Sequence, residues 1–407
     1  MAAMGTNMSG RVVVAVGLLA LAVACSGDDG SEGDGASPAA GAADREGASD
    51  GVSDTGDWSV EDPGDHGLDP AQLEQARDYA FAEGRNTQGV VVARDGVIVA
   101  EWYADGAGPD SWAASWSMAK SFTSATIGIA IDQGLIPGVD EPMTTWYPEF
   151  AGTERADMTL RDVLQMGSGL DWVEDYDPNA AAQSDIIRMV TGESDQLAFA
   201  AGQPPAVAPG TRWNYSSGDT QLLSGVLAQA TGMPADEYAR QELFEPLGMT
   251  KVEWWRDAAG HTLTYCCLDT TSRDFARLGQ LYLQGGRWGD EQVLPEAWVD
   301  ESWEPSEASE EIDEPYGFQW WLGDPEGVDA DVTAAVGHDG QWIYVIPELD
   351  MVVVRNGTYV KNPGPPVADP ILFPLYPSDG FIPGQGTAPP DDWDDGEFLG
   401  PIVAAAR

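Results

Sequence analysis

The sequence has few basic, cysteine and histidine residues, and each shortage excludes a class of function. The 407 residues include 19 Lys and Arg against 68 Asp and Glu, for a formal net charge of -49. Such a chain repels nucleic acid and anionic lipid head groups, so we expect it to bind neither by charge. The 3 Cys cannot form a disulfide scaffold, and His66, His261 and His338 are widely separated. We therefore expect no metal and no other cofactor.

The sequence offers no apolar run that would span a bilayer comfortably. The apolar run near the N-terminus, residues 12–24 (VVVAVGLLALAVA), directly precedes Cys25. A run of this length is typical of a signal peptide, and small residues before a Cys resemble the bacterial lipobox, in which the Cys is lipidated. We therefore expect residues 1–25 to be a lipoprotein-type signal peptide, and the protein to be exported and anchored to a membrane by lipid. The alternative is an ordinary signal peptide with a coincidental Cys.

The rest of the chain divides by composition. Residues 26–65 are mostly Gly, Ala, Ser and Asp. We expect a disordered acidic linker there, because such a segment buries too little apolar surface to offset backbone ordering. Residues 378–407 are an acidic tail rich in Pro and Gly, in which Ile402-Val403 is too short to form a core element. Hydrophobic residues make up 43% of the chain, so residues 66–377 are expected to form the folded domain.

Between these ends the pattern predicts an α+β fold. A helix is expected at 70–83 after the N-cap Asp69, and a strong hairpin signal surrounds Asp95-Gly96. The other predicted elements are the hairpin strands 89–94 and 97–103, a helix at 271–284, and strands at 316–322, 341–347 and 349–355. Because strands lie at both ends with helices between, we expect one antiparallel sheet flanked by helices, with a helical insertion.

Ser117 and Lys120 begin a stretch that predicts a buried helix, because residues 121–135 (SFTSATIGIAIDQGL) are largely apolar or small. A Ser in the first helical turn lies near the positive helix end, which favours a developing anion. A Lys three residues later lies on the same face, and in an apolar setting it loses its charge readily and can accept the Ser proton. The alternative is a helix-capping Ser with a surface Lys.

Tyr215 is the second candidate, within residues 213–219 (WNYSSGD). A turn signal at Pro209-Gly210 and a predicted helix from Thr220 place it on a loop at a helix start. There a phenol can relay a proton between the Ser hydroxyl and a leaving group, if a neighbouring Lys lowers its pKa. The alternative is a Tyr that only packs.

The third candidate is residues 337–341 (GHDGQ), which lead into a predicted strand. A Gly-rich entry lets the backbone of a strand lie alongside a substrate, where an N–H group can complete an oxyanion hole. A tight hairpin turn explains the same residues.

In this order, S-x-x-K, Y-x-[NS] and [KH]-x-G resemble the serine β-lactamase and penicillin-binding-protein superfamily. The resemblance extends over about residues 68–377 and includes residues 165–170 (QMGSGL) and 270–288 (TTSRDFARLGQLYLQGGRW). Residues 171–178 (DWVEDYDP) are most similar to the 6-aminohexanoate-dimer hydrolase and class C-like esterase branch. The resemblance implies a serine hydrolase that cleaves an amide, ester or peptide bond of a small molecule, without a cofactor.

The resemblance also implies roles for individual residues. Ser117 would be the nucleophile, Lys120 its activator and Tyr215 the general acid/base. The backbone N–H groups of Ser117 and Gln341 would form the oxyanion hole. The implied substrate-contacting positions are Tyr176, Asp185, Ser217, His338 and Gly340.

Two positions depart from the β-lactamase pattern. Ser217 stands where class C enzymes carry Asn, and His338 stands where β-lactamases carry Lys. A fixed cation there would bind a substrate carboxylate, whereas a His is mostly neutral at pH 7. This weakens the case for a true β-lactamase and leaves D-aminopeptidase, D-Ala-D-Ala carboxypeptidase, esterase and amide-oligomer hydrolase open. The competing hypothesis is a non-catalytic module of the same fold that binds or senses cell-wall peptides or β-lactams.

Cys266 and Cys267 are adjacent and precede the predicted helix at 271–284. In an oxidising exterior they would form a vicinal disulfide or remain buried thiols. We expect a structural role, because Cys is usually core filling.

Overall fold

The computed structural model describes residues 58–176, 182–312, 315–357, 359–361, 381–386 and 393–407. Within these residues, no helix is both long and apolar enough to cross a membrane. The expected signal peptide, Cys25 and the linker up to residue 57 lie outside the described residues. Export and lipid anchoring therefore stay predictions.

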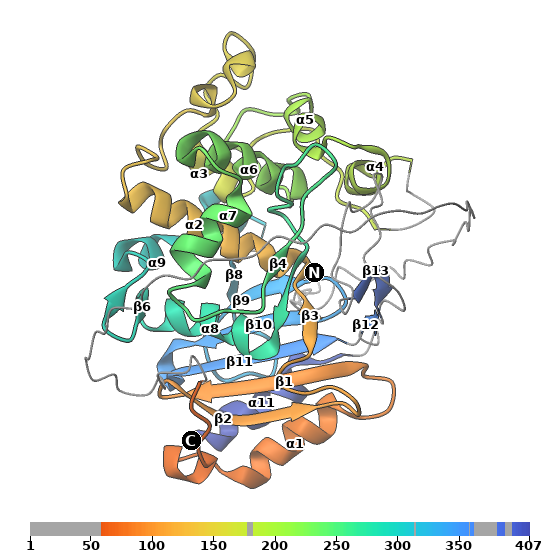
Figure 1. Ribbon diagram of the computed structural model, residues 1–407, viewed down its shortest axis with the longest axis vertical. Helices are drawn as coiled ribbons and strands as arrows, with labels where there is room; N and C mark the ends of the chain where they lie inside the picture. The colour runs from red at the N-terminus through yellow and green to blue at the C-terminus, as the bar shows by residue number, and fades with distance from the viewer. Residues whose placement is uncertain (1–57, 177–181, 313–314, 358, 362–380, 387–392) are drawn as a thin grey trace, which may run out of the picture.

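The central sheet has six strands, in the order β2-β1-β11-β10-β9-β8, and every neighbouring pair is antiparallel. The strands are β1 (Thr87–Arg94), β2 (Val97–Tyr103), β8 (Trp321–Gly323), β9 (Val332–Gly337), β10 (Gln341–Ile346) and β11 (Met351–Gly357). Strand β1 pairs with β11, so segments from the two ends of the fold lie side by side (Figure 1). This confirms the predicted α+β fold and the hairpin at Asp95-Gly96, where both residues have positive φ.

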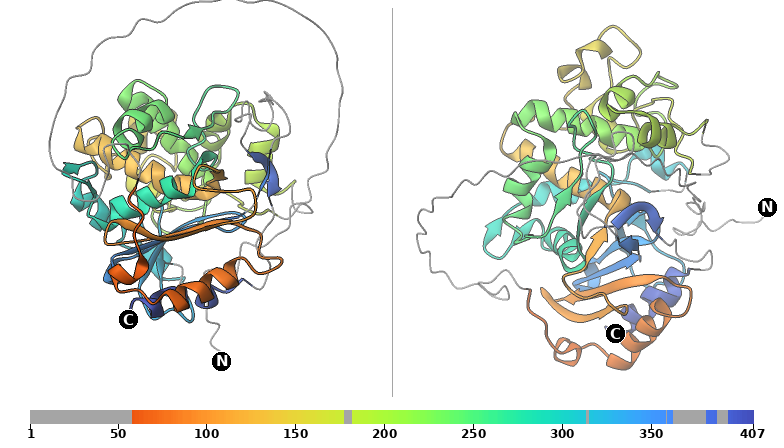
Figure 2. Two further views of the ribbon diagram at one scale, coloured as in Figure 1. Left: turned by 60° about the horizontal axis from the view of Figure 1, so that its bottom comes forward. Right: turned by 45° about the vertical axis from the view of Figure 1, so that its right-hand side comes forward.

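Two helical layers cover the two faces of the sheet. Alternate side chains of β1 enter different cores: Val90 and Val92 pack with helices α1 (Pro70–Ala80) and α11 (Asp395–Ala405), whereas Val91 and Ala93 face the larger core. Helix α8 (Ser272–Leu283) packs on that second face, as Figure 1 and the left view of Figure 2 show.

The helical part lies beyond α8 and centres on α2 (Ala119–Asp132), which is buried along nearly its whole length and packs against α6 (Ser217–Thr231) (Figure 1). The other helices are α3 (Leu160–Leu164), α4 (Asp185–Gly192), α5 (Gln196–Ala201), α7 (Ala235–Ala239), α9 (Glu296–Ser302) and α10 (Glu307–Glu310). The short single-turn segments are η1 (Pro63–His66), η2 (Trp116–Met118), η3 (Met143–Thr145), η4 (Pro148–Phe150), η6 (Arg240–Phe244) and η7 (Pro347–Leu349). The small sheets contain β3 (Trp112–Ala114), β4 (Glu253–Trp254) and β5 (Leu268–Thr271); β6 (Arg287–Trp288) and β7 (Glu291–Gln292); β12 (Tyr359–Lys361) and β13 (Phe381–Gly386).

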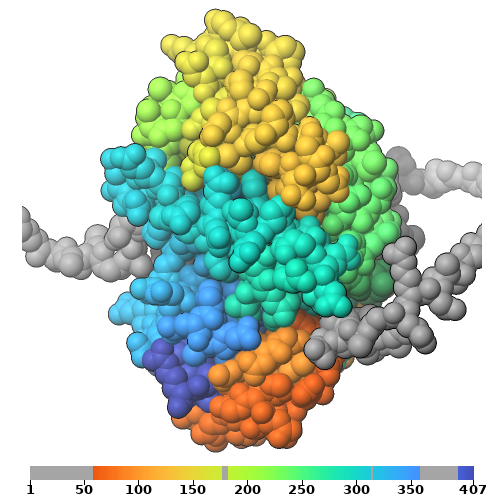
Figure 3. Space-filling model, turned by 90° about the vertical axis from the view of Figure 1, so that its left-hand side faces the viewer, coloured from red at the N-terminus to blue at the C-terminus, as the bar shows by residue number. Residues whose placement is uncertain are grey.

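The prediction that the C-terminal tail contributes no core element is wrong. Helix α11 lies against α1, and the two termini of the fold meet at the bottom of the molecule in Figure 3. Ile402 and Val403 are buried together with Phe398 and Leu399. The composition of the tail concealed this helix, because its apolar residues gain burial only from a partner helix more than 300 residues away in sequence.

The folded part also starts earlier than residue 66. Trp58 is 3% exposed, donates a hydrogen bond from Nε1 to the Gly96 carbonyl at 2.6 Å and contacts the ring of Trp288. Val60 forms a parallel bridge with Ile98. The predicted strand at 316–322 is shorter than expected, because Gln319 has a φ of 64° that interrupts extended structure.

Replacing Phe398 by Ala tests whether α11 belongs to the core. Phe398 is fully buried and packs against Trp393 and Tyr344. We expect the free energy of unfolding in urea to fall by about 3–5 kcal/mol, because the substitution leaves a cavity. Glu397→Ala, at an exposed neighbour on the same helix, should change it by less than about 0.5 kcal/mol. Equally small effects for both variants would contradict the assignment.

Candidate active site

Ser117 lies on a tight turn between strand β3 and helix α2. The turn is the single-turn segment η2, in which Trp116 has a φ of 45°. Gly337, at the end of β9, leaves room for the turn, because a Cβ there would lie 2.3 Å from the Ser115 carbonyl oxygen and 3.0 Å from Gln341 Cβ. The Ser117 turn and the start of β10 therefore lie on either side of Gly337, which brings together the two segments predicted to form an oxyanion hole.

Lys120 lies one helical turn after Ser117 and is 1% exposed. Its Nζ donates hydrogen bonds to Ser117 Oγ at 3.1 Å, to Ser217 Oγ at 3.1 Å and to the Tyr265 carbonyl oxygen at 2.9 Å. Burial lowers the pKa of Lys120 to about 8, although the charge of Glu174 acts in the opposite direction. The amine therefore loses its proton at a lower pH than an ordinary lysine does.

Tyr215 reaches the same point from the loop before α6. Its phenol interacts with the Ser117 side chain, and its ring centroid lies 5.1 Å from Lys120 Nζ. Stacking on Trp321 at 5.5 Å fixes the ring. Burial raises the pKa of Tyr215 well above its usual value, as does the charge of Glu174, and the interaction with Ser117 opposes this only in part. The condition that a neighbouring Lys lowers this pKa is therefore not met, because burial dominates.

Glu174 is a member of the site that sequence reasoning missed. Its carboxylate accepts hydrogen bonds from Ser217 N at 3.0 Å and Ser217 Oγ at 2.7 Å. It also accepts from Trp172 Nε1 at 2.5 Å and Tyr176 OH at 2.6 Å. Ser217 thus links Glu174 to Lys120. The sequence signals it only through the DWVEDYDP stretch, because an acidic residue does not stand out in a chain with 68 Asp and Glu.

An aromatic wall of three rings, Trp116, Tyr176 and His338, adjoins Ser117. Tyr176 stacks on His338 with centroids 5.2 Å apart, and Trp116 meets the same imidazole edge-on at 5.6 Å. His338 Nε2 lies 3.2 Å from Asp339 Oδ1. The side chain of His338 is 14% exposed, so the position of the β-lactamase cation is filled by a ring packed between two others.

Gly340 and Gln341 lie where the β9–β10 turn enters the sheet. Asp339 and Gly340 both have positive φ, and Arg355 holds the turn by donating Nη1 hydrogen bonds to the carbonyl oxygens of Asp339 at 3.2 Å and Gly340 at 2.6 Å. The Gln341 side chain accepts hydrogen bonds from Asn356 and from the Gly357 backbone. The side chain of Gln341 is thus anchored in the sheet, which leaves its backbone as the part that can serve the site.

Asp185 is held by local partners at the start of a helix. It begins α4, where its carboxylate accepts a hydrogen bond from Val173 N at 2.9 Å and pairs with Arg188 at 3.0 Å. Within the described part of the chain, it makes no hydrogen bond to Ser117 or Lys120. Its contact with substrate stays a prediction.

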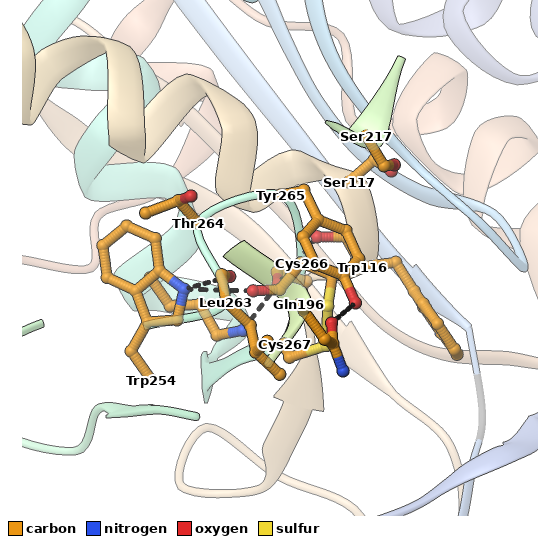
Figure 4. The surroundings of a disulfide bond; sticks show 12 residues. Trp116, Ser117, Gln196, Ser217, Trp254, Leu263, Thr264, Tyr265, Cys266 and Cys267 are labelled. Carbon is orange, nitrogen blue, oxygen red and sulfur yellow. Dashed lines mark hydrogen bonds between the residues drawn. A yellow bond between two sulfur atoms is a disulfide. The ribbon is translucent and has the colours of Figure 1, made fainter. Parts of the chain in front are cut away.

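Cys266 and Cys267 form a disulfide, so the first of the two expected states is the one observed (Figure 4). The disulfide directly follows Tyr265, whose carbonyl accepts the Lys120 hydrogen bond. In the residues that the structure describes, no group of three or more His, Cys, Asp or Glu could hold a metal ion.

The Beta-lactamase family model matches residues 73–371. The chain belongs to the beta-lactamase family. It is 26% identical over 290 residues to 6-aminohexanoate-dimer hydrolase of Paenarthrobacter ureafaciens, covering 67% of this chain and 73% of that protein. It is 30% identical over 157 residues to "Esterase/beta-lactamase LipL" of Mycobacterium tuberculosis, covering 37% of this chain and 34% of the relative. The structure of a putative 6-aminohexanoate-dimer hydrolase from Bacillus anthracis superposes with a TM-score of 0.59 at 22% identity, over 67% of this chain and 74% of the other.

These matches confirm the resemblance inferred from the motifs, and they identify the chain as a serine hydrolase of this family. The structural likeness supports the fold alone. The Ser117, Lys120 and Tyr215 side chains, which the motif order predicts to work together, are in mutual contact.

Replacing Glu174 by Gln tests its electrostatic influence on Lys120. Because the Glu174 charge raises the pKa of Lys120, its removal should move that pKa below about 8. The chain has three Lys, so an NMR titration of ¹³C-labelled lysine side chains resolves the shift directly. Asp171→Asn, at an exposed carboxylate in the same segment, should leave the Lys120 titration in place. An unchanged or raised Lys120 pKa in Glu174→Gln would contradict the assignment.

Proposed function

We propose that the protein is an exported, lipid-anchored serine hydrolase that cleaves amide or ester bonds through an acyl-enzyme on Ser117. One observation carries the catalytic part: the Ser117 hydroxyl accepts a hydrogen bond from the buried Lys120 amine and interacts with the Tyr215 phenol. A module that only binds peptides needs no such proton-transfer set. Export rests on the signal-peptide pattern of residues 1–25.

In acylation, Ser117 Oγ bonds to the substrate carbonyl carbon and passes its proton to neutral Lys120. The backbone N–H groups of Ser117 and Gln341 stabilise the oxyanion. Tyr215, kept protonated by its raised pKa, donates its proton to the departing amine or alcohol and regains one from Lys120. A water molecule then attacks the acyl-enzyme, and Ser117 recovers a proton as the acid leaves.

The aromatic wall favours substrates without a carboxylate next to the scissile bond. His338, packed between Trp116 and Tyr176, stands where β-lactamases carry Lys. The nearby guanidinium of Arg355 is bonded to the backbone carbonyls of Gly340 and Arg85. These features support linear amides and esters over β-lactams and D-Ala-D-Ala peptides. The relative matched over most of its length is named a 6-aminohexanoate-dimer hydrolase, whereas the name of the shorter match includes both esterase and beta-lactamase. A panel of nitrocefin, short p-nitrophenyl esters, D-Ala-D-Ala peptides and a linear aminohexanoate dimer separates these classes.

Ser117→Ala tests the nucleophile. We expect the variant to lose turnover of p-nitrophenyl esters and all covalent labelling by a fluorophosphonate probe, because no other step forms the acyl bond. The wild-type protein should gain one probe adduct, located on Ser117 by peptide mass spectrometry. Hydrolysis by Ser117→Ala at the wild-type rate would overturn the proposal.

The pH dependence of ester hydrolysis tests the role of Lys120. The amine is charged below its pKa of about 8 and cannot then accept the Ser117 proton. We therefore expect kcat/KM to rise with pH and to level off above about 8, since kcat/KM reports groups of the free enzyme. Lys251→Met removes a lysine that lies over Trp112, away from the site, and should keep the same profile. A profile that is flat from pH 6 to 9 would contradict the assignment.

A further inference from the structure

The Tyr265 carbonyl is the least adjustable partner of the Lys120 amine. Two of the three acceptors on Lys120 are the hydroxyls of Ser117 and Ser217, which rotate about a side-chain bond. The third is a backbone oxygen, and its direction is fixed by the path of the chain. The orientation of the amine toward Ser117 therefore depends on what holds the backbone at Tyr265.

The Cys266–Cys267 disulfide begins at the next residue along the chain. Cys267 has a φ of 66°, a left-handed conformation that a residue with a side chain rarely adopts without constraint. The cross-link joins adjacent residues and so restricts the rotations of the peptide unit between them. Figure 4 shows the disulfide beneath Tyr265, with Ser117 and Ser217 on the other side of that residue.

Three further hydrogen bonds anchor this loop away from Lys120. Trp254 Nε1 donates to the Cys266 carbonyl at 3.0 Å, and Trp255 N donates to the Cys267 carbonyl at 3.1 Å. The Tyr265 hydroxyl donates to Gln196 at 2.7 Å. Both carbonyls that follow Tyr265 are thus bonded away from the site, and the Tyr265 carbonyl alone among these three accepts from the amine.

We propose that the Cys266–Cys267 disulfide is a positioning element, which fixes the Tyr265 carbonyl against the Lys120 amine. Opening the bond then lowers turnover by loosening the amine, not by unfolding the protein. This rests on the proposed function, in which Lys120 accepts the Ser117 proton. A buried pair of thiols would fill the same space in the core, so filling the core does not account for a cross-link at this place.

Reduction of the disulfide should also change the hydration of the Lys120 amine. When Cys267 is released from its left-handed conformation, the Tyr265 carbonyl turns and water reaches Nζ. Because burial is what lowers the pKa of Lys120, hydration moves that pKa back toward its usual value. The acid limb of the kcat/KM profile should therefore move to higher pH.

The test compares the full-length oxidised protein with the same protein treated with a phosphine. The phosphine takes oxygen from water and becomes a phosphine oxide, while the disulfide gains two electrons and two protons and becomes two thiols. Intact mass confirms the reduction. We expect kcat for a p-nitrophenyl ester to fall about 10- to 100-fold with little change in KM, because small displacements of a reacting group have effects of this size. The acid limb should move upward in the same sample.

Two variants separate positioning from stability. Cys266→Ser/Cys267→Ser should have the kcat and the pH profile of the reduced protein. Phosphine should not change its activity, although the variant still contains one cysteine, Cys25. Cys266→Ala/Cys267→Gly also lacks the cross-link, but the Gly at position 267 can adopt the left-handed conformation without strain. It replaces the serine variant in the comparison if that variant folds poorly. All rates are divided by the number of sites that react with fluorophosphonate.

Three results would overturn the proposal. One is an unchanged kcat and acid limb after reduction. Another is a loss of activity in proportion to the loss of labelled sites and of thermal stability, with an unchanged pH profile per labelled site. That result would indicate that the disulfide only stabilises the fold. The last is the absence of labelling at Ser117 in the oxidised protein. This result would contradict the proposed function as well. In the first two results Ser117 labelling of the oxidised protein persists, so the two failures are distinguishable.

Discussion

The burial of one lysine amine is the constraint on which this site depends. An ammonium taken out of water destabilises a protein unless it finds hydrogen-bond partners, and Lys120 finds them in three separate segments. These are the turn before α2, the first residue of α6 and the loop before β5. A shift of any one of them leaves a buried donor without its acceptor, so the helical part and the loops around it must pack as one unit.

Local chemistry made part of this arrangement predictable from the sequence. Ser117 and Lys120 are one helical turn apart, so their contact requires only that the helix forms. The sheet followed from alternating strands and from the Asp95-Gly96 turn, whose requirement for positive φ is a strong signal. Tyr215 has no local relation to Ser117, and only the order of the three motifs pointed to it.

The other features of the site and the fold depend on contacts between distant segments, and such contacts leave little trace in the sequence. The Tyr265 carbonyl is a group that every residue possesses, so no residue type signals its role. Glu174 is one of 68 acidic residues, and composition conceals it. In the same way, the Pro- and Gly-containing tail concealed α11, whose Phe398 acquires a core only when α1 lies beside it.

Two electrostatic effects oppose each other at Lys120, and their balance sets the protonation of the amine. Burial favours the neutral amine, whereas the charge of Glu174 favours the ammonium. Burial is the larger effect, so the pKa of the amine falls to about 8. In the proposed function, the Glu174 carboxylate disfavours a substrate carboxylate beside the amine, and the position where β-lactamases carry Lys is occupied by His338, packed between two rings.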